Sequence, residues 1–203
     1  IGAGTPLVVF GNTLIAGSTR FPLLTRANGH AIVLATGGNT VAGVAVNKTS
    51  GSCIFGSAVT NAAFADLQLS SCVSGINLQH ANGALSFTGA IAVKSTSDYA
   101  VSITDATATI AIASLTVTGC NGGLQVSDFD GTLTVSGSVT INNPSGSEIG
   151  ISLTNTFPTK HTAPTFIFNG PVSVTQGGDA ISILGNGPTA KVSFANQIGR
   201  AHV

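Results

Sequence analysis

The stretch Gly75-Ile76-Asn77-Leu78 recurs in altered form along the chain and predicts its architecture. Each copy is a small residue followed by an apolar, a polar and a second apolar residue. Such alternation is typical of a β-strand with one buried face. Weaker copies occur around Ile32 and Ile54. The later copies are Ala100-Val101-Ser102-Ile103, Gly123-Leu124-Gln125-Val126, Gly150-Ile151-Ser152-Leu153 and Ala180-Ile181-Ser182-Ile183.

Each period of 22–30 residues contains two further alternating segments. One set is Leu85/Phe87, Ile110/Ile112, Leu133/Val135, Phe166/Phe168 and Val192/Phe194, and the other is Ile91/Val93, Leu115/Val117, Val139/Ile141 and Val172/Val174. Between the two sets lie glycine steps such as Thr88-Gly89, Ser136-Gly137 and Asn169-Gly170, where we expect sharp corners with positive φ.

Three short strands per period and no helical pattern predict an all-β, right-handed parallel β-helix, a solenoid whose coils pair in register at about 4.8 Å. We expect one solenoid domain over residues 1–197, open at both ends. A β-sandwich is the alternative, but an antiparallel sandwich has no reason to repeat the same three-strand block at this spacing. The neighbouring coils of the chain are therefore each other's first partners.

The composition agrees with a stacked structure. The chain has 203 residues, of which 43% are hydrophobic and only 7% are charged, and its formal net charge is zero. An average globular chain carries about 25% charged residues. Ladders of like charges on neighbouring rungs repel, so Ser, Thr and Asn serve better on the outside of a solenoid. Low charge with this much apolar content excludes ordinary disorder, and zero net charge with no basic run argues against a nucleic-acid or membrane-surface binder. No apolar stretch approaches the roughly 18 residues of a membrane span.

Both ends of the sequence are interpreted as non-native. The chain begins with Ile1 and contains no methionine, so we expect it to be a fragment whose start, with any signal peptide, is missing. The last six residues, 198–203, resemble the translation of a sequencing-library adapter. We therefore exclude Arg200 and His202 from the search for functional residues.

Several segments resemble right-handed parallel β-helix repeat proteins of large bacterial surface or secreted polypeptides, of the autotransporter or adhesin type. The similarity is carried by Gly2–Val9, Gly38–Val46, Ser74–Leu78 and Gly131–Gly137. The resemblance implies an extracellular or cell-surface location and a non-enzymatic role as a structural or adhesive stalk segment. It implies surface glycans, or host or cell-surface proteins, as partners, and no cofactor.

One column of residues carries a second hypothesis, a carbohydrate-active enzyme. The residue four positions after the first apolar residue of the period is His80, Asp105 and Asp128 in three successive coils. Stacking places the two carboxylates on adjacent rungs, where they repel, which suits acid/base chemistry in a glycoside hydrolase or polysaccharide lyase. With Asp130, two residues further on, the pair could instead bind a cation such as Ca²⁺. The alternative is that Asp and His are ordinary corner residues.

The longest period carries an insertion, Asn155–Pro164. Insertions in solenoids form loops on one face, often the binding face, so Phe157, Lys160 and His161 are candidate ligand contacts. A contact patch of this kind would suit a carbohydrate-binding β-helix such as a phage tail fibre. A simple tolerated insertion is the alternative.

Three cysteines leave at least one thiol unpaired. Cys72 and Cys120 lie four residues before Ile76 and Leu124, so they are equivalent positions two coils apart, or about 10 Å. A disulfide requires Cα atoms within about 7 Å, so we expect no bond between them. We interpret the cysteines, Cys53 included, as small buried hydrophobic residues.

Overall fold

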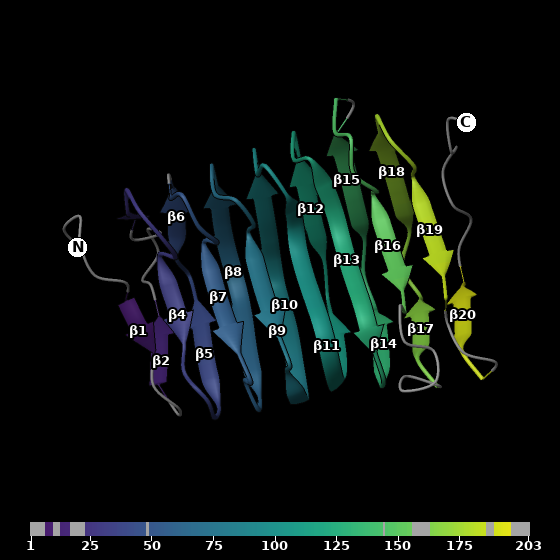
Figure 1. Ribbon diagram of the computed structural model, residues 1–203, viewed down its shortest axis with the longest axis horizontal. Coiled ribbons are helices and arrows are strands. Elements are labelled where there is room, and N and C mark those ends of the chain that lie inside the picture. Colours follow the sequence, from purple (N-terminus) through teal and green to yellow (C-terminus); the bar gives the residue numbers. More distant parts are fainter. Residues whose placement is uncertain are drawn as a thin grey trace.

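In the computed structural model of the protein, the described residues contain twenty β-strands, which wind into a parallel solenoid of about seven turns (Figure 1). The structure describes residues 7–9, 13–16, 23–47, 49–143, 145–155, 163–185 and 189–195. These residues contain no helix, which confirms the predicted all-β parallel β-helix. None of the described segments is a helix long and apolar enough to cross a bilayer.

The strands form three parallel sheets that run along the axis of the solenoid, and three strands bend around a corner to join two sheets. Sheet 1 contains β1 (Leu7–Val9), β4 (Ile32–Leu34), β7 (Ile54–Ser57), β9 (Ile76–Gln79), the start of β11 (Tyr99–Ile112), β13 (Gly122–Phe129), β16 (Ile151–Thr154) and β19 (Ile181–Leu184). Sheet 2 contains β2 (Thr13–Ala16), β5 (Asn39–Ala42), the starts of β8 (Ala62–Ser70) and β10 (Asn82–Lys94), the end of β11, β14 (Thr132–Val135), β17 (Thr165–Phe168) and β20 (Lys191–Phe194). Sheet 3 contains β3 (Leu23–Thr25), β6 (Ala45–Asn47), the ends of β8 and β10, β12 (Leu115–Thr118), β15 (Val139–Asn143) and β18 (Val172–Gln176).

The register between coils follows the sequence repeat. Every first apolar position of the repeat pairs with its counterpart in the next coil, in the series Ile32, Ile54, Ile76, Val101, Leu124, Ile151 and Ile181. A one-residue slip would turn every buried side chain toward solvent, so this alternation specifies the pairing strongly. The predicted repeat is therefore confirmed in register as well as in fold.

The core is a continuous column of apolar side chains inside the three sheets. Sheet 2 contributes a phenylalanine ladder, in which Phe64 and Phe87 stack with ring centroids 4.9 Å apart and Phe168 and Phe194 stack at 4.8 Å. Phe64 and Phe87 are buried, whereas Phe194 is only partly buried against the core. The ladder aligns because in-register parallel pairing places identical positions of successive coils side by side.

Glycine serves two different purposes at the predicted corners. Gly89 has a φ of 66°, as expected for a left-handed corner residue. Gly170 is needed for space instead, because a Cβ atom there would lie 1.8 Å from the backbone oxygen of Gly137 in the preceding coil. The expectation of positive φ is thus confirmed at Gly89, while Gly137 and Gly170 are absent from the residues with positive φ.

A disulfide that the sequence analysis did not predict joins Cys53 to Cys72, with a Cα–Cα distance of 5.6 Å. Cys53 directly precedes β7 and Cys72 follows β8, so the bond closes one coil at the corner between sheets 3 and 1. The interpretation of the cysteines as buried hydrophobes is wrong for these two and holds for Cys120, which is a buried free thiol. The expected absence of a Cys72–Cys120 bond is confirmed.

The coil repeat predicts where a second disulfide can be built. Cys120 occupies the place of Cys72, because both thiols approach the carbonyl oxygen two residues earlier, at 3.7 and 3.3 Å. Ala100 directly precedes Val101, which pairs in register with Ile76 and through it with Ile54, so Ala100 occupies the place of Cys53. We expect Ala100→Cys to form a bond with Cys120 and to raise stability by about 3 kcal/mol.

Thiol titration and mass spectrometry under non-reducing conditions would detect the new bond. Ala108→Cys is a matched control, because Ala108 is also buried but lies in sheet 2. A free thiol count that rises for both variants would contradict the assigned equivalence of the two coils.

Candidate functional site

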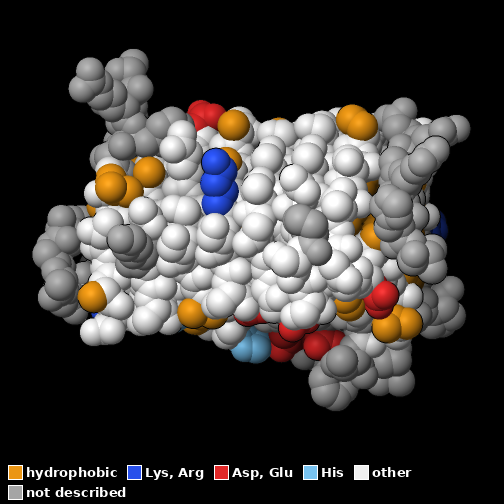
Figure 2. Space-filling view, turned by 90° about the horizontal axis from the view of Figure 1, so that it is seen from above, with side chains coloured by type: hydrophobic (Ala, Val, Ile, Leu, Met, Phe, Trp, Pro, Cys, Tyr) orange, Lys and Arg blue, Asp and Glu red, His pale blue; other side chains and the backbone are white. Residues whose placement is uncertain are grey.

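The corner between sheets 1 and 2 brings His80, Asp105 and Asp128 onto three successive rungs, as predicted. The residue that precedes each of them pairs in register with its counterpart in the next coil. Gln79 pairs with Thr104, and Thr104 pairs with Ser127. The Nδ1 atom of His80 lies 3.0 Å from the carboxylate of Asp105. We call these three residues the corner column. Figure 2 shows a histidine and acidic side chains gathered along one edge of an otherwise almost uncharged face.

The backbone explains why these residue types occupy the corner column. His80, Asp105 and Asp128 all have positive φ, at 52°, 48° and 49°. Asn, Asp and His are enriched several-fold among the non-glycine residues that adopt this left-handed conformation. Asp66, with a φ of 50° at the corner between sheets 2 and 3, is a parallel case, since its carboxylate accepts a hydrogen bond from the Ala90 amide at 3.0 Å. The corner geometry is thus sufficient to account for the acidic pair.

The corner column is also open to solvent. The side chains of His80 and Asp105 are 59% and 37% exposed, so their contact is screened by water and contributes little to stability. Asp130 follows buried Phe129 and donates its backbone N–H to the Ala106 carbonyl at 2.9 Å. Within the described ranges, no group of three or more His, Cys, Asp or Glu side chains is placed to hold a metal ion.

The second candidate patch, Phe157, Lys160 and His161, lies outside the described residues. The residue before this stretch is described and firmly held. Asn155 is 3% exposed, and its Oδ1 accepts a hydrogen bond from the Phe129 amide at 2.8 Å while its Nδ2 donates to the Phe129 carbonyl at 3.4 Å. The insertion therefore begins at an asparagine that ties two coils together.

A buried tyrosine spans several coils at the start of sheet 1. The Tyr99 side chain bonds to the backbone of Ile149 and the side chain of Ser152, two coils further on. Its ring passes over Gly122, where a Cβ atom would lie 2.6 Å from a ring carbon. Burial is the main reason that the pKa of Tyr99 is raised, and the carboxylates of Glu148 and Asp98 add to the effect. Tyr99 therefore acts as a structural tie.

A stacked aromatic pair lies near the N-terminal end of sheet 1. The rings of His30 and Phe55 have centroids 4.3 Å apart, and the His30 Nδ1 accepts a hydrogen bond from the Ser52 amide at 3.0 Å. Burial, and then the charge of Arg26, lower the pKa of His30. A neutral imidazole suits this role, because Nδ1 must keep its lone pair to accept the hydrogen bond from the Ser52 N–H group.

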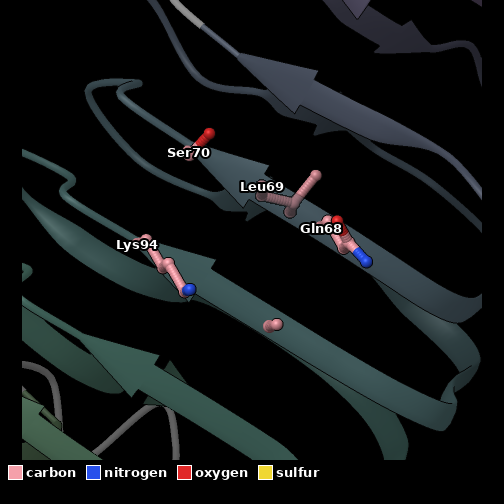
Figure 3. A pocket seen from close by; sticks show the side chains of 5 residues that line it. Gln68, Leu69, Ser70 and Lys94 are labelled. Atoms are coloured by element: carbon pink, nitrogen blue, oxygen red, sulfur yellow. The ribbon is translucent and has the colours of Figure 1, made fainter. Parts of the chain in front are cut away.

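A groove that the sequence pattern does not predict lies on the outer side of sheet 3. It has a volume of about 380 Å³ and is lined by Gln68, Leu69, Ser70, Ala92 and Lys94 (Figure 3). These residues belong to the ends of β8 and β10, which are adjacent strands. The sequence indicates the groove only through Ala92, whose side chain is shorter than those of its register partners Gln68 and Thr116 in the neighbouring coils. We call this feature the Lys94 groove.

Comparisons of the chain with protein-family models, with curated proteins and with solved structures find no match.

Proposed function

We propose that this chain is a structural and adhesive stalk segment of a bacterial surface or secreted protein, of the autotransporter or adhesin type, without enzymatic activity. The observation that carries the proposal is the uninterrupted in-register stacking of sheet 1 from β4 to β19. A solenoid of this kind is a stiff, quasi-one-dimensional rod that holds the exposed side chains of successive coils at regular spacing.

The disulfide supports an extracellular or cell-surface location. Disulfides persist in oxidising compartments and are rare in the cytosol, where thiols are kept reduced. Cys53 and Cys72 are both buried and their bond closes a single coil, which is the arrangement expected of a structural bond. The partners that suit such a rod are surface glycans, or host or cell-surface proteins.

Adhesion under flow tests the proposal directly. Beads coated with the chain are expected to be retained on bacterial or host-cell surfaces, and beads coated with an unrelated protein of similar charge are expected to wash off. Equal wash-off of both kinds of bead from every surface would contradict the adhesive role. Retention only on bacterial surface polysaccharide would favour the alternative, a carbohydrate-binding β-helix such as a phage tail fibre.

A carbohydrate-active enzyme is the second candidate function, and the corner column favours it, because the His80–Asp105 pair lies beside Asp128. We expect the chain to release neither reducing ends nor unsaturated products from acidic and neutral polysaccharides. The double variant Asp105→Ala/Asp128→Ala should behave in the same way. Asp66→Ala is a matched control at another left-handed corner. Degradation by the natural chain that the double variant loses, while the control keeps it, would establish the enzyme instead.

A further inference from the structure

The Lys94 groove lies on the outer side of sheet 3, away from the corner column. Figure 3 shows Gln68 and Ser70 on one strand and Lys94 on the next. Its volume of about 380 Å³ falls at the lower end of the range for small-ligand sites. The groove therefore has room for a compact polar group.

The register explains why the sheet is hollow at this point. Ala92 pairs with Gln68 on one side and with Thr116 on the other, so one short side chain lies between two longer ones. Lys94 pairs with Ser70 and Thr118 in the same way. All of these side chains point outward, because the buried residues Leu69 and Val93 alternate with them. The hollow is thus built from outward positions and leaves the core intact.

The groove carries one isolated positive charge. Lys94 is exposed and is the only Lys or Arg on the described strands of sheet 3. The nearest carboxylate along β8, Asp66, lies at the preceding corner and bonds to the Ala90 amide. An ammonium in such neutral surroundings favours an anionic group of a ligand.

Two hydrogen-bonding side chains line the groove together with Lys94. Gln68 supplies an amide and Ser70 a hydroxyl.

We infer that the Lys94 groove binds an acidic glycan, with a uronate carboxylate on the Lys94 ammonium and sugar hydroxyls on Gln68 and Ser70. The inference deepens the proposed adhesive function, because it names the class of partner and the place where the rod holds it. A glycan suits the groove, since Gln68, Ser70 and Lys94 offer amide, hydroxyl and ammonium groups beside the apolar surface of Leu69 and Ala92, and a sugar ring carries both hydroxyls and an apolar C–H face.

Isothermal titration calorimetry with oligogalacturonate tests the inference, and the fully methyl-esterified oligomer of the same length is the neutral control. The natural chain is expected to bind the acidic oligomer and to lose about tenfold or more in affinity for the neutral one, as expected for one charge-assisted hydrogen bond. Lys94→Gln should show the same loss toward the acidic oligomer, and Ala92→Gln should weaken binding by filling the hollow.

Two variants serve as controls. Lys191→Gln removes an exposed lysine from sheet 2, and Thr140→Gln places the same glutamine two coils from Ala92 in the same column. Both are expected to bind like the natural chain, and thermal unfolding should have the same midpoint in all four variants. Equal binding of the two oligomers, equal affinity of Lys94→Gln and the natural chain, or no measurable binding would overturn the inference.

Two results distinguish the groove as a binding site from the adhesive role of the rod. If beads coated with the natural chain and beads coated with Lys94→Gln adhere to cells equally well, the chain is adhesive but the groove is not its binding site. Lys94-dependent binding of oligogalacturonate by a chain that adheres to no surface would support the groove and remove the adhesive role.

Discussion

Replacing Phe87 with alanine is expected to lower the free energy of unfolding by about 3–5 kcal/mol. Phe87 is 2% exposed and stacks on Phe64 with ring centroids 4.9 Å apart. The substitution removes apolar burial and leaves a cavity that rigid neighbouring coils cannot close. Because each coil contacts only its neighbours, we expect the loss to be concentrated in β8, β10 and β11.

Urea unfolding measures the total effect, and amide hydrogen exchange locates it along the solenoid. Thr116→Ala is the control, because Thr116 points outward and its replacement should change stability by less than about 0.5 kcal/mol. Phe87→Leu should cost less than Phe87→Ala, since more of the cavity stays filled. Equal stability of Phe87→Ala and Thr116→Ala would show that this position does not belong to the core.

Removing the disulfide has the second large effect. The double variant Cys53→Ala/Cys72→Ala is expected to lose about 3 kcal/mol, because the bond joins residues 19 apart and restricts the unfolded chain. A reductant should reproduce the loss in the natural chain and should have no effect on the variant. Comparison of urea unfolding curves with and without reductant measures both effects.

Cys120→Ala provides the matched control for the disulfide. Cys120 is buried and unbonded, so its variant should lose only the small packing contribution of one sulfur atom and should keep its sensitivity to reductant. If the natural chain unfolds at the same urea concentration with and without reductant, the Cys53–Cys72 bond does not contribute to stability.

The strand order, the faces of the strands and the register between coils follow from the local pattern. Ile76 and Leu78 alternate with polar residues, and Val101 and Ile103 repeat the pattern in the next coil. A parallel stack buries both pairs only when Ile76 lies beside Val101, so the repeat leaves one pairing. The corner column was predictable for the same reason. His80, Asp105 and Asp128 each lie four residues after a paired apolar position, so they occupy adjacent rungs.

The remaining features depend on contacts that the repeat does not encode. Cys53 and Cys72 lie 19 residues apart, at the beginning and the end of one coil. Only the path of the chain around the coil brings their Cα atoms to 5.6 Å. The Lys94 groove likewise depends on the relative lengths of side chains on adjacent rungs, Ala92 beside Gln68. Alternation states which face a residue occupies, whereas contacts across corners and hollows between side chains arise from the packing of the closed coils.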